Sequence, residues 1–209
     1  MNTPDLMPIL STGAHDSPAE GACIMEMASF LSGDAWTDSP ACTHPVIARM
    51  AQVVNDRLSD ERRGDLLPLL PRIMGTAATG TAHERHVLSV RLAVWCARQV
   101  LPLVRAADRD VCKKAIVAAE DWREGTASAE QCRTAAAAAN AAAAAATYAA
   151  AATYAAAAAA NAATNDDLTN DDLTALLTGL LDEHDRLTGR DPVPALPAED
   201  IKRLAALTT

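Results

Sequence analysis

Aromatic side chains are scarce in this chain of 209 residues: it has one Phe, two Tyr and three Trp, or 3% of the sequence. Large rings usually dominate the burial energy of a core. The core must therefore be built from Leu, Val, Ile and Met, which concentrate in residues 6–120. The hydrophobic content of 50% overstates this material, because alanine supplies much of it and buries little area per residue. The length suits one globular core, or a core with an appendage.

Clustered positive charge is also missing. Residues 1–134 carry 14 Lys/Arg against 17 Asp/Glu, and residues 135–209 carry four against ten. Binding to a phosphate backbone needs clustered cations, so nucleic acid is not expected as a partner. Residues 165–185 contain seven Asp/Glu and no Lys or Arg. We interpret this acidic run as a solvated helix face, because it lacks the regularly spaced oxygen ligands and turn glycine of a calcium loop.

No segment is typical of a membrane span or a signal peptide. The most apolar stretch, residues 87–104, is interrupted by Arg91, Arg98 and Pro102. The N-terminus, MNTPDLMPIL, lacks a basic region followed by an apolar core. The five cysteines are an odd number and widely spaced, which predicts reduced thiols and a cytoplasmic location.

Alanine is what the sequence has in abundance. Residues 135–163 hold 23 alanines among 29 positions and no charge. Because alanine has the highest helix propensity, this tract is predicted to be helical. Asn140, Thr147, Tyr154 and Asn161 recur every seven residues and would share one edge of the helix. The remaining methyl surface would let another helix approach closely, either in the same chain or in a second copy.

Helix start and stop signals predict an all-α fold. Capping boxes at Ser17, Thr81 and Ser128 predict helix starts, and Pro45 can open a further helix. No run of β-branched residues alternates with polar residues for long, so no strand is predicted. The expected architecture is a compact N-terminal helical bundle with a long Ala-rich helix and a C-terminal amphipathic helix.

Changes in composition divide the chain into five predicted segments. They are an irregular N-terminal arm (1–16), a helical core domain (17–125), the Ala-rich helix (126–164), an acidic amphipathic helix (165–190) and a Pro-rich linker with a short terminal helix (191–209). The acidic helix would bury a leucine face and end at Gly189.

The residues best suited to bind a metal are Cys42, His44, His83 and His86. Two histidines three positions apart share one helix face, and a Cys-x-His loop could supply two further ligands. This pattern gives the hypothesis of a zinc site. The interpretation favoured over it is that the histidines lie at the surface and the thiol is buried. No other motif requires a cofactor.

A second position of interest is Glu26, on a predicted helix with Cys23. Cys23 is interpreted as a small core residue. The position of Glu26 on this helix favours a place at the boundary of the core. If the carboxylate faced the core instead, it would need a partner or a shifted pKa and would indicate a site. Asp34, Asp38 and Asp56 could join it in a carboxylate cluster. No hydrolase, phosphate-loop or zinc-protease motif is present, so catalysis has little positive support and no catalytic residue is assigned.

The block GACIMEMASFLSGDAWTDSPACTHPVIARMAQVVNDRLSDERR resembles the opening of an uncharacterised family of bacterial, largely actinobacterial, and phage proteins. In that family an Ala-rich stretch dotted with Tyr follows, and then a segment similar to LLDEHDRLTGR. The resemblance covers roughly residues 20–190. Some members have cysteine at the position of His44, which implies a soft metal ligand there. No activity is attached to the family, so the resemblance implies architecture and not function.

Three functions are compatible with these patterns. The leading hypothesis is a non-catalytic helical interaction protein whose Ala-rich helix serves self-association or a protein partner. The second is a metal-binding protein or metal-dependent enzyme with a Cys/His site. The third is ice binding, because Ala-rich helices with threonine resemble one class of antifreeze protein. Only Thr153 and Thr164 keep the eleven-residue spacing of that class.

Overall fold

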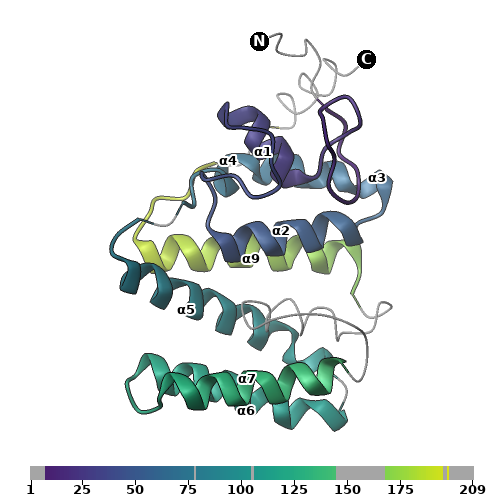
Figure 1. Cartoon of the computed structure of the whole chain (residues 1–209). Helices are drawn as coiled ribbons and strands as arrows, with labels where there is room; N and C mark the ends of the chain where they lie inside the picture. Colours follow the sequence, from purple (N-terminus) through teal and green to yellow (C-terminus); the bar gives the residue numbers. More distant parts are fainter. Residues whose placement is uncertain (1–7, 78, 105, 145–167, 195–196, 198–209) are drawn as a thin grey trace. The chain divides into compact units, whose positions relative to one another are not determined.

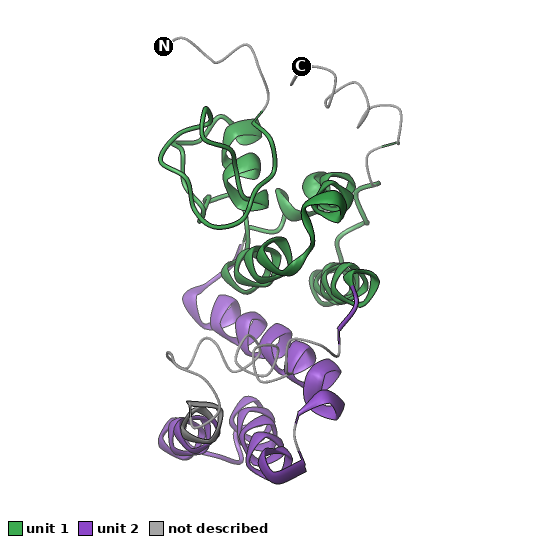
Figure 2. Cartoon of the chain, turned by 90° about the vertical axis from the view of Figure 1, so that its right-hand side faces the viewer, with its two compact units in different colours: residues 1–78, 170–209 green, residues 79–169 purple. Residues whose placement is uncertain are grey.

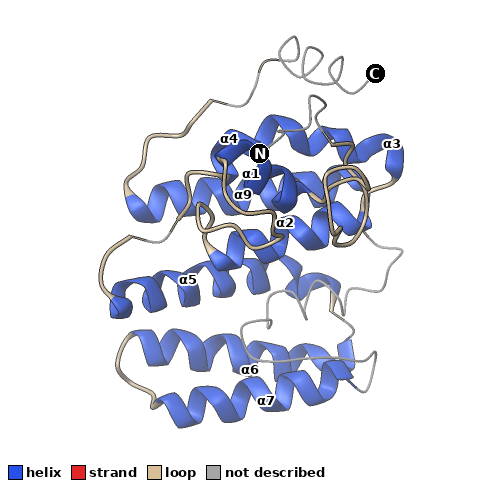
Figure 3. Cartoon of the chain, turned by 45° about the horizontal axis from the view of Figure 1, so that its top comes forward, coloured by secondary structure: helices blue, strands red, loops and turns tan. Residues whose placement is uncertain are grey.

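The computed structural model describes residues 8–77, 79–104, 106–144, 168–194 and 197. In these ranges every regular element is a helix, which confirms the predicted all-α class, and Leu10 and Ala22 form an isolated bridge (Figure 3). Backbone contacts divide the chain into two compact units (Figure 2). Unit 1 comprises residues 1–78 and 170–209, and unit 2 comprises residues 79–169. The boundaries of the five predicted segments follow changes in composition, whereas those of the two units follow backbone contacts. The five segments therefore stay a prediction.

Unit 1 is built from short helices of the N-terminal region and one long helix from later in the chain (Figure 1). Its elements are α1 (Ile24–Ser32), α2 (Pro45–Arg57), α3 (Asp60–Arg63), the 3-10 helix η1 (Gly64–Leu69), α4 (Leu70–Ile73) and α9 (Asn170–Thr188). Helix α9 packs against α2 and η1, and α1 packs against α2 and α4. The fully buried apolar side chains of this core include Ile24, Met25, Met27, Ile47, Leu66, Leu70, Ile73, Leu177, Leu180 and Leu181.

Several elements of unit 1 follow the predicted signals. Helix α2 begins at Pro45, where a missing N–H has no helical partner to lose. Proline also explains why residues 59–73 form three short pieces: Pro68 and Pro71 interrupt a continuous α-helix. The leucine face of α9 is buried as predicted, and the helix is followed by Gly189 with φ 65°.

The predicted helix start at Ser17 is wrong, because α1 begins at Ile24. Residues 17–20 form a turn in which the Glu20 N–H donates to the Ser17 carbonyl at 3.1 Å. The Glu20 carboxylate accepts the Asp16 N–H at 3.3 Å instead of completing a capping box. Cys23 caps α1: its Sγ accepts the Glu26 N–H at 3.4 Å, and the Glu26 carboxylate accepts the Cys23 N–H at 2.8 Å.

Unit 2 contains α5 (Ala82–Val100), the 3-10 helix η2 (Leu101–Leu103), α6 (Ala106–Arg123) and α7 (Ala129–Ala144). Helix α6 packs against both α5 and α7. The predicted capping boxes form at the starts of α5 and α7, where Thr81 and Ser128 accept the N–H groups three residues later at 3.2 Å.

Helix α7 contains the first part of the Ala-rich tract. Residues 145–163 of the tract, with the threonines and tyrosines of its polar edge, lie outside the described residues, as does the side chain of Asn140. In the part of the chain that is described, no helix is both long and apolar enough to cross a membrane.

Candidate functional site

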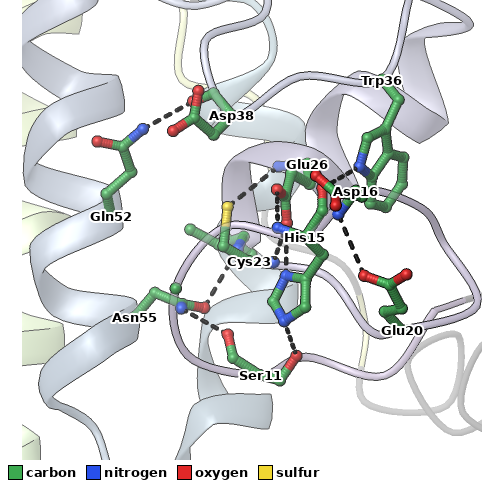
Figure 4. A network of polar contacts seen from close by, with 12 residues as sticks. Ser11, His15, Asp16, Glu20, Cys23, Glu26, Trp36, Asp38, Gln52 and Asn55 are labelled. Carbon is green, nitrogen blue, oxygen red and sulfur yellow. Dashed lines mark hydrogen bonds and ion pairs between the residues drawn. The ribbon is translucent and has the colours of Figure 1, made fainter.

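The N-terminal loop, residues 11–22 of unit 1, closes on itself and carries a network of polar side chains (Figure 4). Its two ends are joined by backbone hydrogen bonds. The Ser11 N–H donates to the Ala22 carbonyl at 2.8 Å, and the Ala22 N–H donates to the Ile9 carbonyl at 2.9 Å. The loop therefore has a defined shape before any side chain is considered.

Glu26 of α1 lies at the centre of this network, with 1% of its surface exposed. Its Oε1 accepts the His15 backbone N–H at 2.7 Å, and its Oε2 accepts His15 Nδ1 and the Cys23 N–H, both at 2.8 Å. Burial by itself raises the pKa of Glu26, but the hydrogen bonds from His15 and Cys23 outweigh it and lower the pKa overall. The site thus holds a buried, ionised carboxylate that three donors satisfy.

The His15 ring lies between Glu26 and Ser11 (Figure 4), and Ser11 Oγ is 2.8 Å from His15 Nε2. An ionised carboxylate can only accept a hydrogen bond, so Nδ1 carries the ring proton. In the neutral ring Nε2 is then an acceptor, and the Ser11 hydroxyl donates to it. The structure therefore places a hydroxyl, an imidazole and a carboxylate in one hydrogen-bonded line.

Groups outside the loop hold this line in place. Asn55 of α2, which is fully buried, donates its side-chain N–H to the Ser11 carbonyl at 2.8 Å and accepts the Ile24 N–H at 3.1 Å. The Trp36 indole N–H donates to the His15 carbonyl at 2.7 Å. The backbones of both loop residues are thus fixed independently of their side chains.

Gly21 completes the site by its lack of a side chain. Its φ of 120° is a conformation that L-residues rarely adopt. A Cβ built there would lie 2.3 Å from Ser11 Oγ and 3.4 Å from His15 Nε2. Any other residue at this position would push the hydroxyl from its place beside the imidazole.

Sequence reasoning found part of this site. The boundary position that the sequence favours for Glu26 is wrong, because its side chain is buried in the core. Cys23 is buried as predicted, and burial raises the pKa of its thiol to about 12. The partners of Glu26 were not found, because neither Ser11 nor His15 belongs to a recognised motif. Their relation to Glu26 depends on the closure of the loop, which no local pattern encodes.

A carboxylate cluster of Glu26 with Asp34, Asp38 and Asp56 is a further possibility from the sequence, and in the structure these three aspartates each accept a hydrogen bond from another group. Asp34 accepts the Ser32 hydroxyl at 2.9 Å, Asp38 accepts the Ser39 hydroxyl at 3.1 Å, and Asp56 accepts the Gly13 N–H at 2.9 Å. The carboxylates bind these nearby polar groups, where the charge of each remains hydrated or hydrogen-bonded.

The interpretation of surface histidines and a buried thiol is wrong for the two candidates of unit 1, where Cys42 is only half-buried and both residues have structural partners. His44 is fully buried and caps α2, since its Nδ1 accepts the Val46 N–H at 3.2 Å. Burial, and then the proximity of His184, lower the pKa of His44 to about 4. The two rings have centroids 6.2 Å apart. Cys42 contacts the Thr43 hydroxyl through its Sγ at 3.6 Å.

The other two metal candidates, His83 and His86, lie on α5 in unit 2 and are exposed. The His86 ring meets Trp122 of α6 edge-on, with centroids 4.9 Å apart. Within the described ranges no group of three or more His, Cys, Asp and Glu side chains is arranged to hold a metal ion. The Cys/His zinc site stays a prediction.

A second polar cluster, in unit 1, joins α4 to α9. The Arg72 guanidinium donates to Asp182 and to Asp185, each at 2.8 Å, and the Arg190 side chain donates to the Arg72 carbonyl at 3.2 Å. Asp185 is 5% exposed. This ionic clasp pairs residues more than a hundred positions apart, which indicates a structural role in closing unit 1.

These features define an all-α protein of two units, one of which carries a Ser-His-Glu line. Residues 80–170 match the sequence profile of an uncharacterised family described as "Imm-5 like putative immunity protein". The match covers less than half of the chain, and its bounds nearly coincide with those of unit 2. Comparisons with curated proteins and with solved structures found no match. The N-terminal block of the resemblance and its bacterial and phage range stay predictions.

Proposed function

We propose that this chain is an immunity protein that neutralises a protein toxin by binding it, and that unit 2 is the binding module. The observation that carries this proposal is the agreement between the family match at residues 80–170 and the compact unit at residues 79–169. Because the segment that matches the family is also a compact unit, we assign the family's role to that unit. Complexes of colicin DNases with their immunity proteins are among the tightest known between proteins.

The helices of unit 2 offer a surface suited to a protein partner. Helix α7 exposes Ala137 and Ala138, and α6 exposes Val117. An alanine methyl has no rotamers to lose on binding, so a partner that covers it pays no side-chain entropy at those positions. The small side chains also let a partner's backbone approach the helix closely. Alanine abundance in this segment thus fits a docking surface.

The distribution of charge separates the two units. Residues 79–169 carry nine Lys/Arg and nine Asp/Glu, so the whole net charge of −9 belongs to the residues of unit 1. Binding through a net-neutral unit depends on shape and apolar contact more than on long-range attraction. We therefore expect the affinity for the toxin to change less than tenfold between about 50 and 300 mM salt. A steep salt dependence would instead indicate binding to unit 1.

The test is to produce the full chain in bacteria together with each toxic protein encoded beside its gene, and to measure growth. The proposal expects one toxin to be neutralised and to form a stable complex with the purified chain. Ala137→Arg introduces a long charged side chain on α7 and should weaken the complex at least about 100-fold. Ala41→Arg, at an exposed alanine of unit 1, is the matched control and should leave it unchanged.

Two results would contradict this assignment. If no neighbouring toxin is neutralised, the chain is not an immunity protein of that toxin set. If Ala41→Arg breaks the complex and Ala137→Arg does not, the binding module is unit 1.

Self-association through the Ala-rich helix is the second candidate, favoured by the same exposed alanines of α7. It predicts a dimer or larger assembly of the purified chain by light scattering. The Ala137→Arg variant should then be a monomer, whereas Ala41→Arg should keep the assembly. A monomeric wild-type protein removes this candidate and leaves the toxin-binding proposal intact.

A further inference from the structure

We propose that Ser11 is a nucleophile activated by His15 and Glu26, and that unit 1 hydrolyses carboxylic esters with small acyl groups. This activity lies outside the segment that matches the immunity family and does not rest on the proposed function. It gives unit 1 a chemistry of its own.

The arrangement meets the geometric requirements of an activated serine. The hydroxyl lies 2.8 Å from one imidazole nitrogen, and the other nitrogen lies 2.8 Å from the carboxylate (Figure 4). A nucleophile within hydrogen-bonding reach of a base that a third group orients is the recurring pattern of such sites, and it is recognised by geometry instead of by sequence order. The carboxylate Glu26 keeps the proton on Nδ1, so Nε2 of His15 is free to accept the proton of Ser11.

A purely structural role does not account for the side chain of Ser11. Its backbone N–H already donates to Ala22 and its carbonyl already accepts from Asn55, so the loop is anchored there without the hydroxyl. The backbone N–H of His15 likewise holds the loop to Glu26. The loop backbone is therefore held without the contact between the Ser11 hydroxyl and the His15 imidazole. This contact instead provides a path for the hydroxyl proton to move to the imidazole.

The surroundings of the hydroxyl limit the substrate. Ser11 is partly exposed and the His15 side chain is 12% exposed, so the line is open to a substrate over a small area only. Gly21 lies so close to Ser11 Oγ that no side chain fits between them. A short acyl group, such as acetyl, satisfies these limits better than a long chain.

The reaction follows in two balanced steps. Ser11 Oγ attacks the ester carbonyl carbon while its proton passes to His15 Nε2, and the carbon–oxygen bond to the alcohol breaks as the alcohol takes up that proton. Water then attacks the acyl-serine, gives a proton to Nε2, and releases the carboxylic acid as Ser11 regains its proton. Glu26 stays ionised throughout and stabilises the imidazolium that forms in each step.

The test treats the full chain with an alkyl fluorophosphonate, which phosphonylates an activated serine and releases fluoride. Peptide mass spectrometry then measures the labelling rate of each serine. We expect Ser11 to be labelled at least about 100-fold faster than Ser39, the size of a general-base effect. Ser39 is an exposed serine whose hydroxyl donates to the Asp38 carboxylate, so it is a matched internal control without an imidazole. The chain that has not been treated with the fluorophosphonate should also hydrolyse p-nitrophenyl acetate.

Variants then assign the roles. Ser11→Ala should abolish labelling at position 11 and the hydrolysis, and His15→Gln should lower both at least about 100-fold. Ser39→Ala should leave both unchanged. If wild-type Ser11 is labelled no faster than Ser39, or if folded His15→Gln is labelled as fast as the wild type, the proposal is overturned. The comparison within the wild-type chain decides the question even if His15→Gln fails to fold.

Discussion

At the scale of single residues, unit 1 buries ionisable groups and satisfies each in a different way. Glu26 is kept charged by three N–H donors, whereas His44 is kept neutral because burial disfavours its cation. Both side chains also cap a helix: Glu26 completes the box at α1 and His44 accepts at the start of α2. Their loss therefore affects both the interior and the helix ends.

Replacement of Glu26 by Gln should lower the free energy of unfolding by about 3 kcal/mol, measured by urea denaturation. The amide keeps one acceptor oxygen but turns an N–H₂ group toward N–H donors of His15 and Cys23, which leaves buried donors unpaired. Glu20→Gln is the control, because that exposed carboxylate accepts a single N–H at 3.3 Å, and it should change stability by less than about 0.5 kcal/mol. Equal effects of the two variants would contradict this role of Glu26.

Replacement of His44 by Asn should flatten the dependence of stability on pH. In the unfolded chain His44 titrates near its ordinary value of 6.5, but in the folded protein its pKa is about 4. Between these values the unfolded state binds the proton and the folded state does not, so stability falls as pH drops from 6.5 to 4. The full effect is about 3 kcal/mol. Asn removes this titration and still provides a capping oxygen.

The matched variant is His44→Ala, which removes the titration and also the capping acceptor. It should show the same flattened pH profile as the Asn variant but lie about 1 kcal/mol lower at every pH. Urea unfolding at a series of pH values measures both effects. A pH profile of His44→Asn parallel to that of the wild type would show that another group causes the acid sensitivity.

At the scale of elements, the helices of unit 2 begin where local capping residues place them. Helix α5 depends on Thr81, whose Oγ1 accepts the Glu84 N–H at 3.2 Å while the Glu84 carboxylate accepts the Thr81 N–H at 2.7 Å. Thr81→Ala should therefore lower the free energy of unfolding by about 1 kcal/mol, and Thr81→Ser should restore most of it. Thermal unfolding measures both, and an Ala variant as stable as the Ser variant would contradict the assignment.

The starts of α5 and α7 could be predicted from sequence because a capping box lies within four consecutive residues. The same pattern at Ser17 does not start a helix. There the loop is held by residues distant in sequence, since Trp36 and Asn55 bind the backbones of His15 and Ser11. The candidate site was missed for the same physical reason. Its three groups meet through loop closure, and propensity and spacing carry no information on such distant pairs.

At the scale of the whole molecule, unit 1 is assembled from two stretches of chain that the ionic clasp of Arg72, Asp182 and Asp185 joins. Arg72→Ala leaves Asp185 buried with a reduced set of cations, and it should lower the free energy of unfolding by about 3 kcal/mol. Hydrogen exchange should show the largest loss of protection in residues 170–188. Arg186→Ala is the control: that arginine is 62% exposed in its pair with Glu183, and its loss should be within about 1 kcal/mol. If the two variants lost the same free energy of unfolding, the ionic clasp would stabilise the protein no more than an exposed ion pair does.

The division of unit 1 also has a consequence for biosynthesis. Helix α9, whose Leu173, Leu177, Leu180 and Leu181 fill the unit 1 core, is translated only after the whole of unit 2. Ribosomes add about 5–20 residues per second, so the synthesis of unit 2 takes about 5–20 seconds. The N-terminal helices of unit 1 are without α9 for this time. During this interval the face of α2 that α9 covers is uncovered, and nascent chains are exposed to chaperones and to aggregation. Unit 2, by contrast, is contiguous and can fold as it leaves the ribosome.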